Sequence, residues 1–272
     1  MKKILLAVIF VTAFSSVGVT AQTVFIPRPP VVYIPLLDPV RMHIQNQVNR
    51  NTINNSVQKG GAKGAKTTVK AGAVDYTVFT PRQENYLPKV LAQAGKGNAA
   101  EQRQAEQFFN TLIANYEQGS PHHQLPKNDV AYGILHFILV NYEVYYDLYE
   151  VPVEKDPWAK RAKDGFERLA LLNTKRSRLT TTEEDRAMYY QFKEMLSAKP
   201  EFKKMTSEEK QKMTETLVIM AGVVNAAYLK AIDAEDEQLI NQAHIAAKGN
   251  LEKLLGVPID KIKINLSGLQ LR

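Results

Sequence analysis

The sequence contains no cysteine among its 272 residues. The fold therefore cannot be held by disulfides, and the protein cannot use thiolate metal ligands or a cysteine nucleophile. Its stability must come from a conventional hydrophobic core, and the chain is long enough to form one sizeable domain. The common signatures of catalysis are also missing: there is no Gly-rich phosphate loop, no His-Glu-x-x-His, no Gly-x-Ser-x-Gly and no calcium-loop spacing.

The part of the chain that we expect to fold also lacks an excess of positive charge. Residues 76–272 contain 26 basic and 26 acidic residues, whereas residues 22–75 contain seven Lys or Arg and two Asp, a net charge of +5. A nucleic-acid-binding domain normally carries its basic excess on the folded surface. This charge distribution argues against a nucleic-acid partner.

The chain begins with the pattern of an export signal. Two lysines precede an apolar run from Ile4 to Phe14, and Val19-Thr20-Ala21 supplies the small side chains that a signal peptidase requires. The apolar run is too short to span a membrane. We therefore expect residues 1–21 to be cleaved, leaving a periplasmic or secreted protein that begins at Gln22 and has no transmembrane segment.

Residues 22–75 form a leader that differs in composition from the rest of the chain. Residues 25–40 are rich in proline, residues 44–57 are rich in Asn and Gln, and residues 59–73 are rich in Gly, Ala and Lys. These compositions favour extended or flexible backbone. Two interpretations stay open: a solvated leader without a partner, or a tether that docks through its apolar residues between 31 and 37.

Helix-capping residues recur at regular intervals after residue 75. We expect residues 76–272 to form an all-α fold, a single bundle of about six to seven helices. Gly119 and Gly256 are the expected ends of the second and the last helix, and Pro88 should interrupt the first. The expected starts are Thr80-Pro81, Asn98, Asn128, Asp156-Pro157, Thr181, Thr206 and about Glu235.

Two short segments near the ends of this domain alternate with a period of two. They are Val74–Val78 and Ile262–Leu266, in which apolar residues alternate with polar or small ones. This alternation is typical of half-buried strands. Because a lone strand cannot satisfy its backbone, we expect the two segments to pair and to bring the ends of the domain together.

The third predicted helix is the most apolar part of the domain. Val130–Tyr142 contains thirteen residues without a Lys, Arg, Asp or Glu. This length suits a buried core helix rather than a membrane span. Its apolar side chains cover two adjacent faces, so neighbouring helices must cover it on several sides. We expect it to be the centre of the bundle.

Several short motifs resemble those of an uncharacterised family of secreted proteins from Gram-negative bacteria. The resemblance covers roughly residues 76–272 and implies an all-helical exported domain. It brings no known activity, and no functional residue is carried over from it. The motifs are Thr80-Pro81-Arg82, Asn128-Asp129-x-Ala131, Phe137-x-x-Val140-Asn141-Tyr142 and Asn250-Leu251-x-x-Leu254-Leu255-Gly256.

One set of polar residues on the third helix could carry chemistry. His136, Glu143 and Asp147 are spaced at i, i+7 and i+11, with Tyr132 one turn before them. They could form a carboxylate–histidine pair for acid–base work or part of a metal site. They could equally be the polar edge of a structural helix, because His136 and Glu143 lie about 10 Å apart along the axis.

A metal site on this stripe would need further ligands from another element. Of the other histidines, His43 falls in the leader, His122 and His123 fall in a predicted loop, and only His244 falls on a predicted helix that could pack beside the third. We therefore favour the structural interpretation of the stripe, and we predict no metal and no cofactor.

These observations predict a binding or structural role at the cell envelope rather than an enzyme. An envelope or secreted protein is the expected partner. The alternative is a hydrolase-like enzyme that uses His136 and Glu143 with a residue from another helix. A deep polar pocket at His136 would favour the enzyme, whereas an exposed apolar groove would favour the binding protein.

Overall fold

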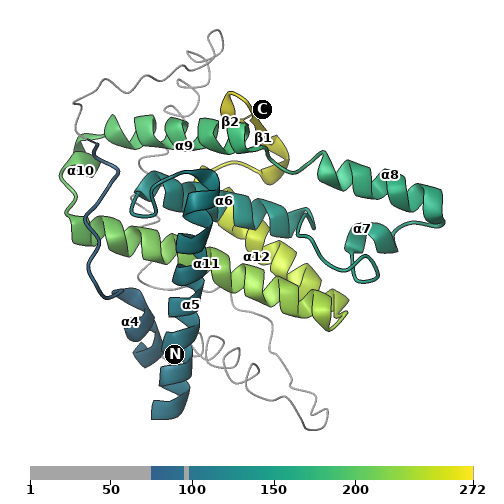
Figure 1. Cartoon of the computed structure of the whole chain (residues 1–272), viewed down its shortest axis with the longest axis horizontal. Coiled ribbons are helices and arrows are strands. Elements are labelled where there is room, and N and C mark those ends of the chain that lie inside the picture. Colours follow the sequence, from purple (N-terminus) through teal and green to yellow (C-terminus); the bar gives the residue numbers. More distant parts are fainter. Residues whose placement is uncertain (1–74, 95–97, 272) are drawn as a thin grey trace.

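The computed structural model describes residues 75–94 and 98–271 (Figure 1). The predicted signal peptide and the leader up to residue 74 lie outside the described residues. The described part of the chain contains nine helices and one two-stranded sheet, which confirms the all-α class. Seven of the nine helices have eight residues or more, in agreement with the expected six to seven.

The described elements follow one another in a simple order, with two very short helices between longer ones. They are α4 (Leu87–Ala94), α5 (Ala99–His123), α6 (Val130–Tyr145), α7 (Pro157–Lys160), α8 (Gly165–Arg176), α9 (Thr182–Ser197), α10 (Pro200–Lys203), α11 (Ser207–Asp233), α12 (Glu237–Leu255), the 3-10 turn η1 (Ile259–Lys261), β1 (Ile262–Asn265) and β2 (Gly268–Leu271).

Helix α6 is the centre of the bundle, as its apolar sequence predicts. Twelve of its sixteen residues are buried, so it is covered on several sides. Helices α9, α11 and α12 pack against it, and α5 crosses the layer that they form (Figure 1). Leu135 and Ile138, in the middle of α6, have no solvent-exposed surface. Most of the hydrophobic core therefore forms around this one helix.

Two contacts fix how closely α6 approaches its neighbours. A Cβ atom added to Gly133 would lie 3.0 Å from the Cγ2 atom of Thr214 on α11. The missing side chain therefore allows α6 and α11 to approach closely. The second contact joins α6 to α12: the Asn250 side chain of α12 donates a hydrogen bond to the side-chain oxygen of Asn141 at 2.9 Å. This bond joins α6 to α12 inside the core.

The helix caps confirm most of the predicted starts. Thr181 and Thr206 each form a complete capping box with the glutamate three residues later, and Gly256 ends α12 with φ 72°. One predicted cap was wrong by a residue. Asp129, not Asn128, caps α6 by accepting a hydrogen bond from the Ala131 amide at 2.8 Å. The Asn128 side chain instead donates to the Phe79 carbonyl at 2.6 Å.

Three predicted helix boundaries were also wrong. The first described helix begins at Leu87 and not at Thr80-Pro81, and Pro88 lies in its first turn instead of interrupting a longer helix, because proline is tolerated where the amide has no helical partner. Helix α5 continues past Gly119 to His123, because Gly119 does not adopt the positive φ that would end it. The predicted fourth helix is divided into α7 and α8, and Asp164 caps the second of these.

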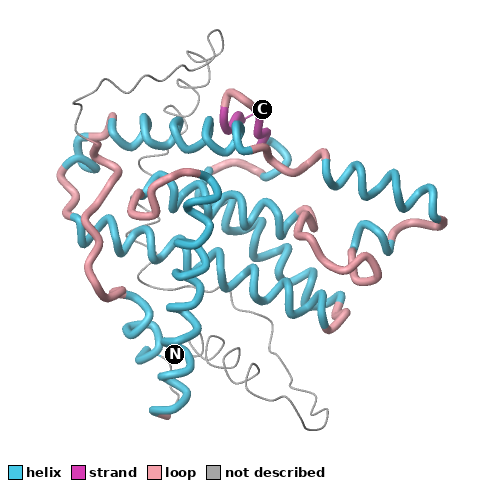
Figure 2. The backbone as a smooth tube through the Cα atoms, viewed as in Figure 1, coloured by secondary structure: helices cyan, strands magenta, loops and turns pink. Residues whose placement is uncertain are grey.

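The predicted pairing of the two terminal strands was wrong. β1 pairs with β2 in a local antiparallel hairpin, with Ile262 opposite Leu271 (Figure 2). Gly268 adopts φ 90° where the chain enters β2. Val78 forms only an isolated bridge with Asp129. A hairpin closes a much shorter loop than pairing between the domain ends would, so its entropic cost is smaller.

Helix α11 is, among the described residues, long and apolar enough to cross a membrane by length and composition. More than half of its most apolar stretch is buried inside the domain. The core helix of a folded bundle has these same properties, and α11 packs against α6, α12 and α5. Its hydrophobicity is therefore accounted for by the core.

Candidate functional site

The structure does not bring the predicted stripe of α6 together as one site. The His136 ring contacts the ring of Tyr116 on α5, with 5.1 Å between centroids. Glu143 instead accepts a hydrogen bond from the Tyr149 hydroxyl, and burial together with this carboxylate raises the pKa of Tyr149 well above its usual value. In the described part of the chain, no group of three or more His, Asp or Glu side chains is placed to hold a metal ion.

Asp147, the third residue of the stripe, lies just beyond the helix. The amide of Asp147 donates to the Val144 carbonyl at 3.2 Å, and the amide of Leu148 donates to the Glu143 carbonyl at 2.8 Å. These two bonds form a Schellman end, whose left-handed position is usually a glycine. Here Asp147 occupies it with φ 56°, a conformation that aspartate tolerates better than most residues. The turn directs its side chain away from the stripe.

The Asp147 carboxylate is the centre of a network from three other elements. Its Oδ2 atom lies 2.7 Å from a guanidinium nitrogen of Arg161, at the end of α7. Its Oδ1 atom lies 2.7 Å from Nε2 of His244 on α12 and accepts a hydrogen bond from the Tyr228 hydroxyl at 3.1 Å. Since a carboxylate only accepts, Nε2 of His244 carries a proton. Asp147 itself is 2% exposed.

The Tyr228 hydroxyl stays a donor in this network. Burial, followed by the nearby Asp147 carboxylate and its hydrogen bond, raises the pKa of Tyr228 far above its usual value. Tyr228 has no exposed surface, so its hydroxyl depends on Asp147 for a partner. The network therefore joins the end of α6 to α7, α11 and α12.

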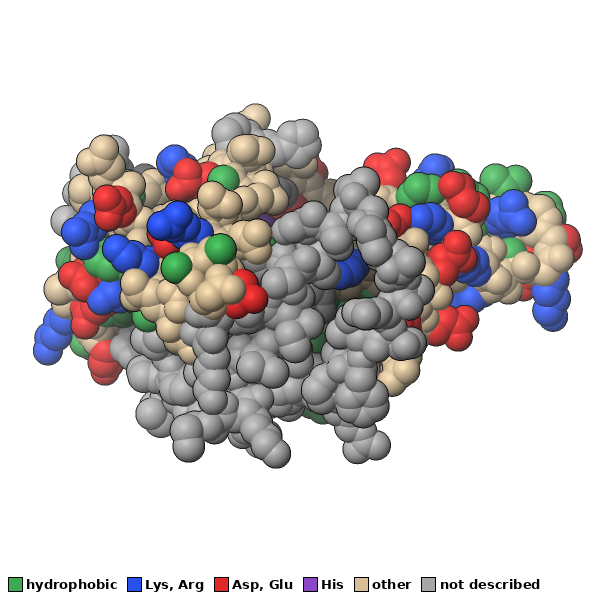
Figure 3. Space-filling view, turned by 90° about the horizontal axis from the view of Figure 1, so that it is seen from below, with side chains coloured by type: hydrophobic (Ala, Val, Ile, Leu, Met, Phe, Trp, Pro, Cys, Tyr) green, Lys and Arg blue, Asp and Glu red, His purple; other side chains and the backbone are tan. Residues whose placement is uncertain are grey.

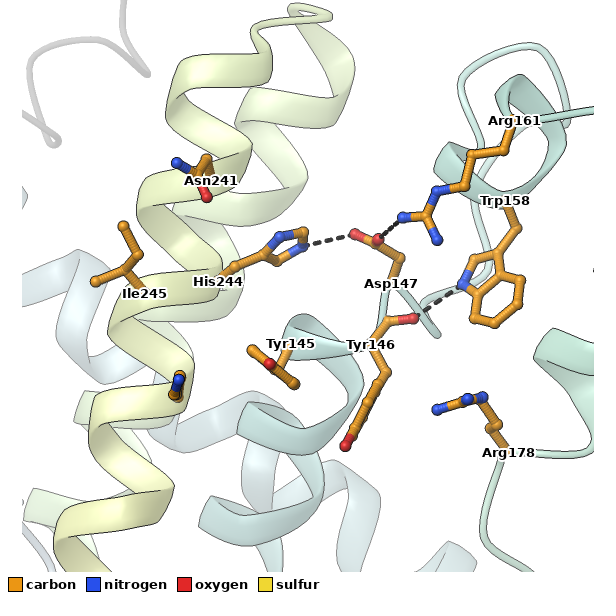
Figure 4. Close-up of a pocket in the computed structure, with 10 residues that line it drawn as sticks. Tyr145, Tyr146, Asp147, Trp158, Arg161, Arg178, Asn241, His244 and Ile245 are labelled. Atoms are coloured by element: carbon orange, nitrogen blue, oxygen red, sulfur yellow. Dashed lines mark hydrogen bonds and ion pairs between the residues drawn. The ribbon is translucent and has the colours of Figure 1, made fainter. Parts of the chain in front are cut away.

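An open pocket of about 440 Å³ lies beside this network (Figure 4). This volume is within the range that holds a small molecule. Figure 4 shows α12 on one side of the pocket, the end of α6 below it, and α7 with the chain after α8 on the other side. The lining residues are Tyr145, Tyr146, Asp147, Trp158, Arg161, Arg178, Asn241, His244, Ile245 and Lys248.

The aromatic part of the pocket is fixed by its own contacts. The indole nitrogen of Trp158 donates to the Tyr146 carbonyl at 2.9 Å. The Arg178 guanidinium lies over both rings, 5.1 Å from the centre of Tyr146 and 5.6 Å from the centre of Trp158. The Arg161 guanidinium, which pairs with Asp147, lies 5.4 Å from the centre of the Trp158 ring. Aromatic rings and guanidinium groups therefore alternate along this wall.

The pocket carries more positive than negative charge. Arg161, Arg178 and Lys248 line it, and Asp147 is the single carboxylate among the lining residues. Asp147 is already paired with Arg161, whereas no ion pair joins Arg178 to a carboxylate within residues 75–94 and 98–271. The closest carboxylate oxygen to Lys248 is that of the partly buried Glu252, 3.9 Å away. The arrangement can therefore accept an anionic group.

A family model matches residues 39–161 and 178–272 of the chain, which is most of its length. The chain belongs to a family of unknown function, DUF6683. The match starts inside the leader, whereas the resemblance noted from the sequence was expected to cover residues 76–272. It omits residues 162–177, which contain α8. No match was found among curated proteins or among solved structures.

Only some of the residues that line the pocket of this DUF6683 domain were identified from the sequence. Asp147 was a candidate and His244 was identified as a helical histidine, but the structure joins these two to each other rather than to His136. Trp158, Arg161 and Arg178 were not identified. Trp158 lies in the four-residue helix α7, Arg161 directly follows that helix, and Arg178 follows α8, so the fold is needed to bring Arg178 to the other two. The catalytic hypothesis for His136 and Glu143 stays a hypothesis.

Proposed function

We propose that this domain is a binding domain that takes up a small anionic ligand in the pocket of Arg178. The ligand would carry a carboxylate or phosphate group next to a flat or apolar body. The observation that carries the proposal is the Arg178 guanidinium, which faces Tyr146 and Trp158 and makes no ion pair with a carboxylate in the described chain. Such a guanidinium presents a planar set of donors that matches carboxylate and phosphate oxygens.

The surroundings of Arg178 support this choice of ligand. Lys248, on α12, adds a second cation to the pocket lining, while Tyr146 and Trp158 supply rings against which a flat group can stack. Asp147 does not repel an anion strongly, because its charge is balanced by Arg161 and its oxygens accept from His244 and Tyr228. Preformed aromatic and cationic groups reduce the ordering cost of binding.

Trp158 is the only tryptophan of the chain, so its fluorescence reports directly on this pocket. We would titrate the protein with phenyl phosphate, inorganic phosphate and benzylamine. The proposal predicts a saturable fluorescence change with phenyl phosphate, a weaker response to inorganic phosphate, and none with the cationic benzylamine. A response to benzylamine equal to that for phenyl phosphate, or no saturable response to either anion, would contradict the proposal.

We also propose that the domain acts at the cell envelope, in the periplasm or outside the cell. This location is supported by the charged and apolar pattern of residues 1–21. The intact mass of the exported protein should correspond to a chain that begins at Gln22. A retained N-terminal segment in the exported form would contradict this location.

A second candidate function is hydrolase-like catalysis, now centred on a different histidine. The contact between His244 and Asp147 is of the kind that orients a histidine for acid–base work. Against it, no Ser, Thr or Cys is among the residues that line the pocket. Hydrolysis of p-nitrophenyl esters by the parent, lost in His244→Asn, would favour this alternative. Equal background rates for both proteins would exclude ester hydrolysis by this pair.

A further inference from the structure

Helix α8 forms an arm that projects from the body of the domain (Figure 1). Its main packing partner is the short helix α7 rather than the bundle. The family match stops at residue 161 and resumes at residue 178, so the interruption contains the whole of this helix. The family model therefore matches the chain on both sides of the arm but does not match the arm itself.

The arm is anchored firmly at its base. The Lys175 ammonium group is buried and lies 2.6 Å from Oδ2 of Asp156 and 2.7 Å from the Tyr149 carbonyl oxygen. At the other end, Asp164 accepts a hydrogen bond from the amide of Glu167 at 2.8 Å, and Glu167 accepts one from the Lys163 amide at 2.7 Å. A fixed base and a capped start hold the helix in place without covering its outer face.

The outer face of the arm is apolar and exposed to solvent. Phe166 is 85% exposed and Leu169 is 65% exposed, and they share one face with the exposed Ala170 and Asn173 at i, i+3, i+4 and i+7. Four of the nine exposed large hydrophobic residues of the described chain fall between residues 153 and 179. Two of them, Phe166 and Leu169, are neighbours on the projecting helix α8 and are the two most exposed apart from Leu266, which indicates a contact surface.

The arm also carries a small excess of positive charge. Residues 162–177, which the family model does not match, contain four Lys or Arg and two acidic residues, a net charge of +2, although residues 76–272 as a whole are neutral. The exposed Arg168 and Arg176 make no ion pair with any residue that the structure describes. Hydrophobic side chains appear among basic and acidic ones at the projecting end of the molecule, at the right of Figure 3.

We propose that the outer face of α8 docks on an anionic lipid bilayer. Phe166 and Leu169 would enter the interface between headgroups and acyl chains, while Arg176, seven residues after Leu169 and therefore on the same side of the helix, would contact lipid phosphates. An apolar face flanked by basic residues is the pattern of a helix that lies on a membrane surface. This contact uses a different surface from the Arg178 pocket and does not depend on it.

A second copy of the chain fits the same surface less well. Two helices of twelve residues are each about 18 Å long, and a pair of that length buries well below the roughly 1,200 Å² of a stable interface. Pairing would also concentrate the unpaired Arg168 and Arg176 side chains of both copies in one place. The positive charge therefore favours a negatively charged surface as the partner.

The absence of native cysteine allows a local test on the full mature chain. We would introduce Ala170→Cys on the outer face of α8, or Ala114→Cys at an exposed position of α5 as a matched control, and attach an environment-sensitive fluorophore. Each protein is mixed with vesicles of phosphatidylglycerol and phosphatidylcholine, or of phosphatidylcholine alone. We expect a blue shift at position 170 with the anionic vesicles only, weakened by added salt.

Two further variants identify the groups that bind. Phe166→Ser with Leu169→Ser should weaken vesicle binding at position 170 by about tenfold or more. Arg168→Glu with Arg176→Glu should weaken it while leaving the apolar face intact. Circular dichroism of each variant verifies that the bundle is folded, which we expect because all four positions are exposed.

Three results would overturn the proposal. One is the absence of a shift at position 170 with anionic vesicles. Another is an equal shift at position 114, because that would show adsorption through some other part of the chain, such as the basic leader. The third is a shift at position 170 without vesicles that grows with protein concentration, because that would identify a second copy as the occupant.

Discussion

Replacing the buried Asp147 by alanine should destabilise the domain strongly. The change leaves the Tyr228 hydroxyl buried without its acceptor, which costs about 1–3 kcal/mol. The lost pair with the half-exposed Arg161 adds at most about 1 kcal/mol. Placing alanine at φ 56° adds about 1–2 kcal/mol. Together these terms give about 2–6 kcal/mol, a large share of the roughly 5–15 kcal/mol that stabilises a domain.

Two further substitutions separate these terms. Asp147→Asn keeps an acceptor and a residue that tolerates positive φ, so it should cost only about 1–2 kcal/mol. Asp147→Gly keeps the backbone conformation but removes the acceptor, and it should fall between the other two variants. Urea unfolding, followed by circular dichroism and by Trp158 fluorescence, gives the three free energies. Alanine and asparagine variants within about 0.5 kcal/mol of the parent would refute the role given to this carboxylate.

Three other substitutions, one of them with a matched control, test the core and the segment that precedes it. Ile138→Asp should unfold the domain, because an unpaired carboxylate at a position without exposed surface costs several kcal/mol. A melting temperature within a few degrees of the parent would show that α6 is not central. Gly133→Val should lower the free energy of unfolding in urea by about 1–3 kcal/mol, because its side chain would press on Thr214. In the control Gly165→Ala, the added methyl group meets no atom within 4 Å, so this change should not destabilise the domain. Burial alone would raise the pKa of Asp75, but hydrogen bonds from Lys193 and Thr77 lower this pKa below 3.8. The ionised Asp75 therefore stabilises the domain above that pH, and this contribution is lost as the pH falls below it. Asp75→Asn should therefore reduce the loss of stability on acidification, and unfolding curves of both proteins between pH 6 and about pH 3 would detect this.

Local rules predicted the helices well, and long-range contacts were the main source of error. Thr181 and Thr206 were found because a capping box is a contact between residues three positions apart. The apolar run of α6 predicted a central helix because its composition requires cover on several sides. In contrast, Val78 and Ile262 were predicted to pair from their alternation alone, although the partner of Ile262 lies in the adjacent segment, after the turn at Gly268.

The pocket was harder to predict because its residues do not share a periodic pattern. Asp147 looked like a continuation of the α6 stripe, but a Schellman end at this position turns it toward His244. Because Asn and Asp tolerate the left-handed conformation, an aspartate just after an apolar helix is a weak indication that the helix ends there. The fourth helix was expected to continue from Asp156-Pro157 as one element, but the chain breaks at Asp164 and α8 leaves the bundle, so Phe166 and Leu169 are exposed.

The central claim is that Arg178 binds the anionic group of a ligand beside Trp158. Isothermal titration calorimetry with phenyl phosphate tests it most directly on three proteins: the parent, Arg178→Gln, and Arg176→Gln as a matched control outside the pocket lining. Loss of a charge-assisted pair of about 1.5 kcal/mol or more should raise the Kd of Arg178→Gln about tenfold or more, with Arg176→Gln within about twofold of the parent. An unchanged Kd for Arg178→Gln, or no binding by the parent, would contradict the account.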